Sequence, residues 1–216
     1  ASATMAPMVN LTRIYTRTGD EGTTALGDFS RTAKTDVRLQ AYADANEANA
    51  VIGVAIATGG LTDEVVATLT RVQNDLFDLG ADLSTPLQAD PEYPPLRVKQ
   101  AWVDELEADC DHYLTQVDKL RSFILPGGTA GSAHLHHATT VVRRAERSAW
   151  AAREVYGTEV ADERGTGGVN PLTTTYLNRL SDLLFILARV ANLEIGGDVL
   201  WQPGGGREER PDRSAR

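Results

Sequence analysis

An apolar seam within residues 62–86 restricts the fold more than any other feature of this chain. Apolar side chains recur there at alternating spacings of three and four residues, at Leu69, Val72, Leu76, Leu79 and Leu83. This spacing places them on one face of an α-helix, as in helices that pack in a bundle. Thr62 is suited to cap the start of the helix, and Pro86 marks its end. The seam therefore predicts a packed bundle helix.

Four further segments have helical composition or periodicity. We predict helices over about 36–58, with Asp36 as N-cap, over 98–120 and over 132–156. A fifth begins at Asn170 and Pro171, which suit the N-cap and first helical positions. Its seam consists of Leu177, Leu180, Leu184, Leu187 and Ala191. A short pattern at residues 9–15 is the one candidate strand, so we predict an all-α, five-helix bundle.

The length of 216 residues suits one domain covering residues 1–216. We expect mobile tails over 1–12 and 203–216, since the latter contains almost no apolar residue. Residues 88–95 carry three prolines and predict a surface connection. Residues 157–169 hold four glycines and several charges, which predicts an exposed insertion.

Composition excludes several classes of protein. A formal net charge of -9 and a pI near 4.9 argue against a general nucleic-acid surface, so any anion site has to be local. No segment reaches the roughly 20 apolar residues that a membrane span needs. Cys110 is the single cysteine and the N-terminus lacks the pattern of a signal peptide. We therefore expect a cytoplasmic protein with a structural thiol.

The run T-R-T-G-D-E-G-T-T at residues 16–24 has the composition of a loop that wraps an anion. Gly19 and Gly22 let backbone N–H groups approach a ligand, the threonines add hydroxyl donors, and Arg17 adds a positive charge. The order of a Walker-type loop is absent. Since Gly, Asp and Thr are also ordinary turn residues, a plain connecting loop remains an alternative.

Two helical faces could complete such a site. Arg143, Glu146 and Arg147 stand at i, i+3 and i+4 and share a face, while Arg144 points about 100° away. Arginine forks bind phosphate oxygens, and a carboxylate can orient an arginine or a magnesium-bound water. The alternative is a solvated face with ion pairs along the helix.

On the last helix, Asn178 and Asp182 share a face distinct from the leucine seam. An amide there suits adenine or ribose recognition, or a neighbouring helix could satisfy it.

The four histidines, His112, His134, His136 and His137, lack the Glu-x-x-His spacing of a di-iron bundle, so we expect structural or surface roles and no metal bound directly by protein ligands. No set of residues for nucleophilic catalysis is evident.

Four motifs together resemble the PduO-type ATP:cob(I)alamin adenosyltransferases. They are I-Y-T-R-T-G-D-E-G-T-T at 14–24, F-I-L-P-G-G at 123–128, R-R-A-E-R at 143–147 and Y-L-N-R-L-S-D-L-L-F at 176–185. The resemblance implies a ferritin-like up-down bundle that forms a homotrimer with ATP sites between subunits. It also implies transfer of the 5′-deoxyadenosyl group of ATP to the cobalt of reduced cobalamin through a four-coordinate Co(II) state, with release of triphosphate.

The resemblance also implies roles for individual residues. ATP would be bound by Thr16, Arg17, Thr18, Gly19, Asp20, Gly22, Thr23, Thr24 and Lys34 of the loop, and by Arg143, Glu146, Arg147 and Asn178 of the helices. Catalysis would depend on Arg143, Glu146 and Phe123, the last packing beside the corrin and displacing its lower ligand. Mg²⁺ would enter with ATP. A cobalamin reductase and an enzyme that depends on adenosylcobalamin would be partners.

Two positions depart from the family pattern. Asn46 replaces an aspartate and Thr139 replaces an arginine, which pair between subunits near the cobalamin in the family. We expect a neutral contact between Asn46 and Thr139 instead, still at the cobalamin site. The insertion at 157–169 also looks longer than usual. The residues are also compatible with two other functions. One is an ATP-dependent corrinoid carrier that delivers the product, and the other is a structural helical bundle.

Overall fold

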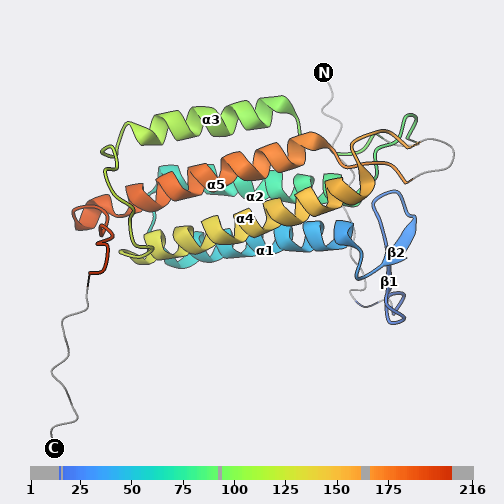
Figure 1. The fold of residues 1–216 in the computed structure, drawn as a ribbon, viewed down its shortest axis with the longest axis horizontal. Coiled ribbons are helices and arrows are strands. Elements are labelled where there is room, and N and C mark those ends of the chain that lie inside the picture. The colour runs from blue at the N-terminus through green and yellow to red at the C-terminus, as the bar shows by residue number, and fades with distance from the viewer. Residues whose placement is uncertain (1–14, 16, 92–93, 162–165, 206–216) are drawn as a thin grey trace, which may run out of the picture.

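Five long α-helices preceded by a small β-hairpin make up the fold, seen in a computed structural model (Figure 1). The structure describes residues 15, 17–91, 94–161 and 166–205. The helices are α1 (Val37–Thr58), α2 (Asp63–Ser84), α3 (Gln100–Leu114), α4 (Ala130–Tyr156) and α5 (Pro171–Ala191). A short 3-10 turn, η1 (Leu193–Ile195), follows α5. The predicted helical bundle is confirmed.

Three helices start at the predicted caps. The side chain of Asp36 accepts a hydrogen bond from the backbone N–H of Arg38 at 2.8 Å, and Asn170 accepts one from Leu172 at 3.1 Å. Thr62 caps α2 in the same way. These side-chain oxygens satisfy backbone donors that have no partner within the first turn of a helix. The local sequence therefore determines where these helices begin.

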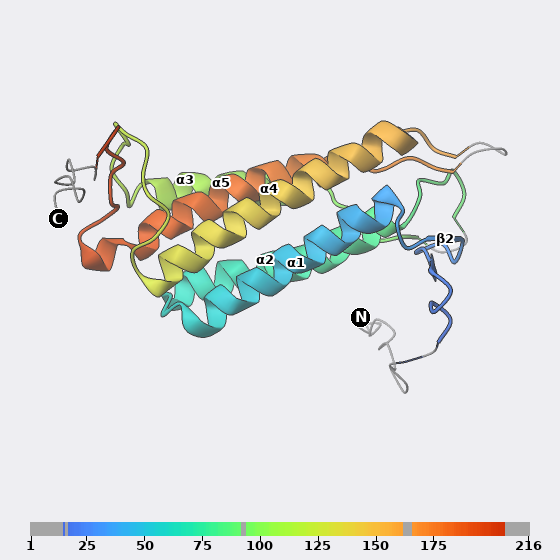
Figure 2. The same ribbon diagram turned by 60° about the horizontal axis from the view of Figure 1, so that its bottom comes forward.

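The helices pack in two layers, with α1 beside α2 and α4 beside α5, and α3 packs on the outside of α5 (Figure 2). The α2 seam is fully buried, as are Leu177, Leu180, Leu184 and Leu187 of α5. Small side chains on α1 (Ala41, Ala45, Ala48) face the core and allow a close approach of α4. Among the described residues, no helix is long and apolar enough to span a bilayer.

The third and fourth helices differ from their predicted bounds. The α3 helix ends at Leu114, not at residue 120, because Thr115 and Gln116 form tight backbone turns and Leu120 is 39% exposed. It starts later than predicted because the N–H of Val98 donates to Asp82 at 2.8 Å. The α4 helix starts two residues early, at Ala130, since Thr129 caps it.

The prediction of an exposed insertion at residues 157–169 is wrong for its last three residues. Gly167, Gly168 and Val169 are buried, and the carbonyl of Gly167 accepts a hydrogen bond from the Arg38 guanidinium at 2.7 Å. Gly167 has no room for a Cβ, which would lie 1.8 Å from the Leu87 carbonyl oxygen. A glycine-rich segment has no side-chain pattern that could reveal its burial.

A β-hairpin that was not predicted begins within the run at residues 16–24, whose last two residues belong to its first strand. Strand β1 (Thr23–Ala25) pairs antiparallel with β2 (Arg31–Ala33), with Thr24 opposite Thr32. Strands of three residues are too short to show an alternating pattern. The candidate strand at 9–15 lies outside the described residues except for its last position, as do the tail at 1–12 and residues 206–216.

Candidate functional site

The glycine- and threonine-rich loop wraps back on itself next to the hairpin. The N–H of Asp20 donates to the Arg17 carbonyl, and that of Gly22 donates to the Gly19 carbonyl. Arg17 and Gly22 adopt left-handed conformations, with φ of 64° and 80°. Glycine enters that region without strain, whereas arginine does so at some cost. Thr16 lies outside the described residues.

Two cations border this loop. Arg31 donates to the Thr18 carbonyl at 2.8 Å and to the Thr23 hydroxyl at 2.5 Å, so it holds the loop in shape. The backbone N–H of Lys34 donates to the Gly22 carbonyl, and its ammonium group lies beside Gly19. Lys34 therefore lies against the loop, and its contact with the phosphates of ATP stays a prediction. Arg31 was missed, because only its long-range contacts identify it.

One carboxylate fastens the hairpin to the bundle. Asp36 Oδ2 accepts hydrogen bonds from the Thr32 hydroxyl of β2 and from the Tyr156 hydroxyl at the end of α4, both at 2.6 Å. Burial raises the pKa of Asp36, but hydrogen bonds from Thr32, Tyr156 and the Arg38 N–H outweigh it and leave the pKa below its ordinary value. The buried guanidinium of Arg38 lies 4.5 Å from the centre of the Tyr156 ring.

Three pairs of facing side chains along α4 and α5 form what we call the α4–α5 row. It comprises Glu146, Arg143 and His136 of α4 and Asn178, Ser181 and Phe185 of α5. Asn178 Nδ2 donates to Glu146 Oε1 at 3.3 Å, and Arg143 Nε donates to Ser181 Oγ at 3.4 Å. The rings of His136 and Phe185 meet edge to face, 5.8 Å apart. The row is therefore polar at one end and aromatic at the other.

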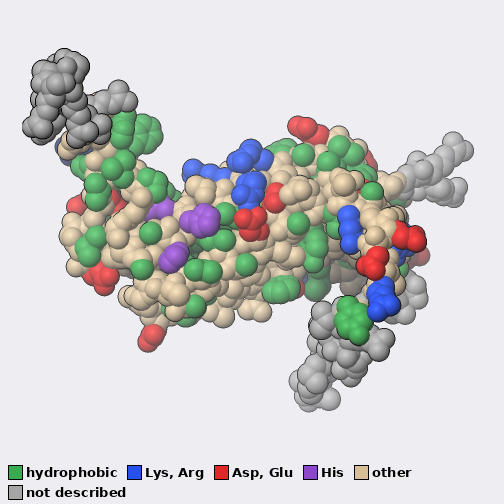
Figure 3. All heavy atoms as spheres, turned by 90° about the horizontal axis from the view of Figure 1, so that it is seen from below, with side chains coloured by type: hydrophobic (Ala, Val, Ile, Leu, Met, Phe, Trp, Pro, Cys, Tyr) green, Lys and Arg blue, Asp and Glu red, His purple; other side chains and the backbone are tan. Residues whose placement is uncertain are grey.

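The arginines of α4 divide between two faces, as predicted. Arg144 pairs with Glu47 and lies 3.7 Å from Asp44, both on α1. Arg143 and Arg147 are exposed, and neither forms an ion pair within the described part of the chain. Figure 3 shows basic side chains grouped beside histidines on one face of the bundle. The guanidiniums of Arg143 and Arg147 therefore have no carboxylate partner among the residues that the structure describes.

The two departures from the family pattern lie apart within one chain. Thr139 is on the same face of α4 as His136 and Arg143, is buried, and donates to the Leu135 carbonyl at 2.9 Å. Asn46 lies on α1 against Gly80 of α2. A contact between these two residues would therefore have to join different chains, and it stays a prediction.

An apolar pocket of about 590 Å³ lies at the aromatic end of the row. It is lined by Phe123, Phe185 and Trp201 together with residues of the segment 120–124. Phe123 is 78% exposed, and its ring meets that of Trp201 edge to face at 6.0 Å. The backbone N–H of Trp201 donates to the backbone carbonyl of Phe123 at 2.8 Å. Sequence patterns missed Trp201, because it stands alone beyond the last helix.

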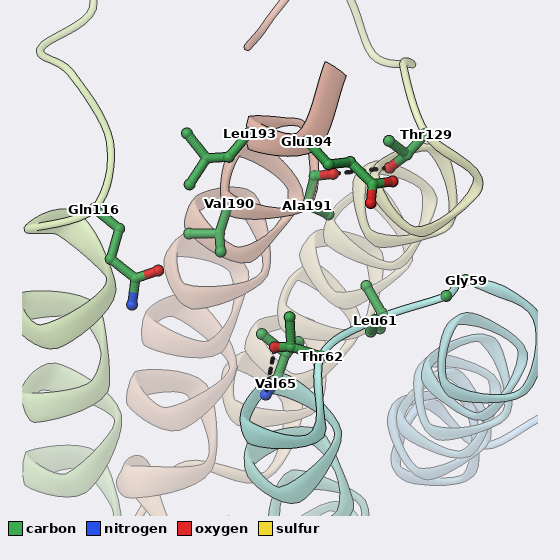
Figure 4. Close-up of a pocket in the computed structure, with 11 residues that line it drawn as sticks. Gly59, Leu61, Thr62, Val65, Gln116, Thr129, Val190, Ala191, Leu193 and Glu194 are labelled. Atoms are coloured by element: carbon green, nitrogen blue, oxygen red, sulfur yellow. Dashed lines mark hydrogen bonds between the residues drawn. The ribbon is translucent and has the colours of Figure 1, made fainter. Parts of the chain in front are cut away.

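Cys110 and a smaller hollow lie outside the loop and the α4–α5 row, whereas His136 belongs to the row. Among the described residues, no group of three or more His, Cys, Asp or Glu side chains could hold a metal ion. His136 is buried, which lowers its pKa, while Asp198 acts to raise it. Cys110 is buried and its pKa is raised to about 11, mainly by burial. A smaller hollow of about 250 Å³ between the ends of α2, α3, α4 and α5 contains no predicted site residue (Figure 4).

The loop and the α4–α5 row lie at different places in one chain. The hairpin is fastened to Tyr156 at the end of α4, and Arg143 lies thirteen residues before it. At 1.5 Å per residue, this separates them by roughly 20 Å along the helix axis. The two predicted parts of the anion site therefore lie well apart within a single chain.

The model of the cobalamin adenosyltransferase family matches residues 14–191. The chain belongs to this family. This member of the family is 58% identical over 199 residues to a corrinoid adenosyltransferase of Mycobacterium tuberculosis. The match covers 92% of this chain and 97% of that protein. The chain is 45% identical over 193 residues to a cobalamin adenosyltransferase of Cupriavidus metallidurans, covering 89% and 95%.

A solved structure of a family member has the same fold. It is a variant PduO-type ATP:corrinoid adenosyltransferase from Lactobacillus reuteri complexed with cobalamin and ATP, with a TM-score of 0.76 and 34% identity. The match covers 88% of this adenosyltransferase and 97% of that chain. The family resemblance inferred from the four motifs is thus confirmed over nearly the whole folded part.

Proposed function

We propose that this chain transfers the 5′-deoxyadenosyl group of ATP to the cobalt of a reduced cobalamin, giving adenosylcobalamin and triphosphate. The observation that carries this proposal is the α4–α5 row, which joins an arginine without an ion pair among the described residues to an aromatic pocket at the other end. Membership of the family and the neighbour complexed with both substrates support it. The row therefore suits an anionic and a largely apolar substrate side by side.

The polar end of the row suits the nucleotide. Arg143 and Arg147 offer guanidinium groups to triphosphate oxygens, and Asn178 offers an amide to the ribose or adenine. Mg²⁺ would enter with the triphosphate. Glu146 is the carboxylate on this face, and its oxygens suit the water ligands of that ion. Positive charge at this position stabilises the leaving triphosphate as the bond from C5′ to oxygen breaks.

The aromatic end suits the corrinoid. Reduced cobalt is itself the nucleophile that attacks C5′, so the protein needs no nucleophile of its own. Its task is to align the substrates and exclude water. The exposed ring of Phe123 offers an apolar surface that excludes a lower ligand from the cobalt. This favours a four-coordinate Co(II) state that is easier to reduce.

A complete site requires a second chain under this proposal. The loop and the row are roughly 20 Å apart along α4, so the loop of one subunit would meet the row of its neighbour. We propose the homotrimer of the family as this assembly. A cytoplasmic location, a cobalamin reductase and an enzyme that uses adenosylcobalamin complete the proposal.

Absorbance spectra of Co(II) cobalamin with the protein, with and without ATP, test the proposal. We expect ATP to produce the spectrum of a four-coordinate species, and chemical reduction with Mg²⁺ present to convert it to adenosylcobalamin. The absence of both changes would refute the function.

Neighbouring arginines supply a matched pair of variants. Arg143→Ala should weaken ATP binding by roughly 10- to 100-fold, the loss of a charge-assisted hydrogen bond, and alter unfolding by less than about 1 kcal/mol. Arg144→Ala removes the same group from a different face of α4, the one that contacts α1, and should leave ATP affinity unchanged. Equal effects of the two substitutions on ATP binding would contradict the assignment of the row.

A further inference from the structure

A second hollow lies beside the aromatic pocket. Its volume is about 370 Å³, and it is bordered by the segment 117–121, by Arg189 near the end of α5, and by residues 196–198 and 200. Leu120 and Arg121 line both this hollow and the Phe123 pocket. The two hollows are therefore adjacent along one stretch of chain.

An extended segment separates the two hollows. Leu200 pairs with Ile124 in an antiparallel bridge, and the N–H of Leu125 donates to the Val199 carbonyl at 2.8 Å. Successive side chains of extended backbone point to opposite sides. Accordingly, Leu200 lines the second hollow and Trp201 lines the aromatic pocket. A ligand that rests on Phe123 can reach the second hollow past Arg121.

The second hollow carries cations without carboxylate partners. Lys119 and Arg121 are both exposed, and neither is in an ion pair among residues 17–91, 94–161 and 166–205. Arg189 also lines the hollow, but Asp198 neutralises it at 2.8 Å. Asp118 also lines the hollow, and its backbone carbonyl accepts a hydrogen bond from Arg189, so the lining carries three cations and two carboxylates. In a chain with a net charge of -9, two unpaired cations beside an apolar pocket favour an anionic group attached to an apolar ligand.

We propose that Lys119 and Arg121 bind the phosphodiester of the nucleotide tail of cobalamin. This inference rests on the proposed function, in which the corrin ring packs against Phe123. A ring held in that way has released its lower base, so the tail that carries the base has to leave the cobalt. That tail contains one phosphodiester with a single negative charge, and the second hollow is the adjacent cationic surface. Charge-assisted contacts to a phosphodiester suit both side chains.

The test compares cobalamin with cobinamide, a corrinoid without the phosphodiester and the base. For Lys119→Gln, which changes a residue that lines the second hollow but not the Phe123 pocket, we expect the KM for cobalamin to rise about 2- to 5-fold, which corresponds to one exposed ion pair. The KM values for cobinamide and for ATP should not change. The cobalamin effect should shrink as salt is added, because exposed charges are screened. Lys99→Gln, an exposed lysine at the opposite end of the bundle, is the matched control and should have no effect.

Several results would overturn the proposal. An equal rise for both corrinoids would mean that the cations act on the ring or on the fold. A rise in the KM for ATP would assign them to the triphosphate instead. No change for any substrate would show that the tail is not bound here, while the proposed transferase activity would still stand. Failure of the unaltered protein to bind either corrinoid would refute the proposed function together with this inference.

Discussion

The variant Tyr156→Phe removes one hydroxyl group. It tests whether the link between the hairpin and α4 shapes the loop at residues 16–24, which we propose binds ATP. The substitution keeps the ring beside Arg38 and deletes only the donor to Asp36, a contact of 2.6 Å. A hydrogen bond to a charged group contributes about 1.5–3 kcal/mol. Asp36 keeps its bonds from Thr32 and from the Arg38 N–H, so we expect the lower end of this range. Unfolding should then occur about 3–6 °C lower.

The same substitution should raise the KM for ATP several-fold and leave the KM for the corrinoid unchanged. Thr32 of β2 shares the Asp36 oxygen with Tyr156, so loss of the Tyr156 contact loosens the strand that follows the loop. The aromatic pocket lies at the opposite end of α4 and should not respond. Initial rates at varied ATP and varied corrinoid separate these two effects.

The difference in the free energy of unfolding between the unaltered protein and Tyr156→Phe should depend on pH. The pKa of Asp36 is lowered below 3.8, so its contribution is present above pH 3.8 and is lost as pH falls through the lowered pKa. Burial and the bond to Asp36 raise the pKa of Tyr156 from 10.0 to about 12, so its contribution is present below pH 10 and is lost as pH rises through about 12. The difference should therefore be flat across neutral pH and shrink on both sides.

Urea unfolding at equal chain concentration, followed by circular dichroism, measures this difference without a change in any oligomer equilibrium. Tyr113→Phe is the matched control, because it deletes a hydroxyl that contacts Thr68 at 2.9 Å away from the hairpin. It should cost stability and leave both KM values unchanged. If Tyr156→Phe behaved like this control, the hairpin link would have no role in shaping the loop.

Three further predictions concern other parts of the structure. Phe123→Ala should impair conversion of Co(II) substrate far more than conversion of pre-reduced Co(I), and equal losses in the two assays would contradict the role of Phe123. Because Phe123 is 78% exposed, the free energy of unfolding should barely change. Cys110 should react with iodoacetamide much more slowly than a free cysteine until the protein is unfolded, because its pKa is raised to about 11. Asp82→Ala should lower the free energy of unfolding by about 3–5 kcal/mol, measured by urea titration, since it leaves Arg97 and Asn170 without their buried partner.

Local patterns predicted the helical framework well. Asp36, Thr62 and Asn170 cap helices where their sequences indicated, because capping depends on residues within one turn. The shared face of Arg143 and Glu146, and the separate face of Arg144, follow from helical periodicity alone. The α3 helix was predicted too long, since its last apolar residues continue the pattern without entering the core.

Contacts between distant segments account for what the sequence did not reveal. Arg38 donates to the carbonyl of Gly167, 129 residues away, and this buries a glycine-rich segment that looked exposed. Trp201 contributes to the aromatic pocket only because its segment pairs with residues 123–125. Neither the segment around Gly167 nor the segment around Trp201 has a periodic apolar pattern. Contacts between segments so far apart in the sequence form only when the bundle is assembled. Family motifs identified Phe123, but no motif identified Trp201.

The pairing of residues 123–125 with residues 199–201 has a consequence for how the substrate range of this enzyme can evolve. Backbone groups make these hydrogen bonds, so the pairing tolerates different side chains at Phe123 and Trp201. Both rings stand outside the helices, and neither belongs to the buried core. Under the proposed function, substitutions that reshape the pocket for a different corrinoid can therefore accumulate with little cost to folding, which leaves this end of the bundle open to selection for new substrates.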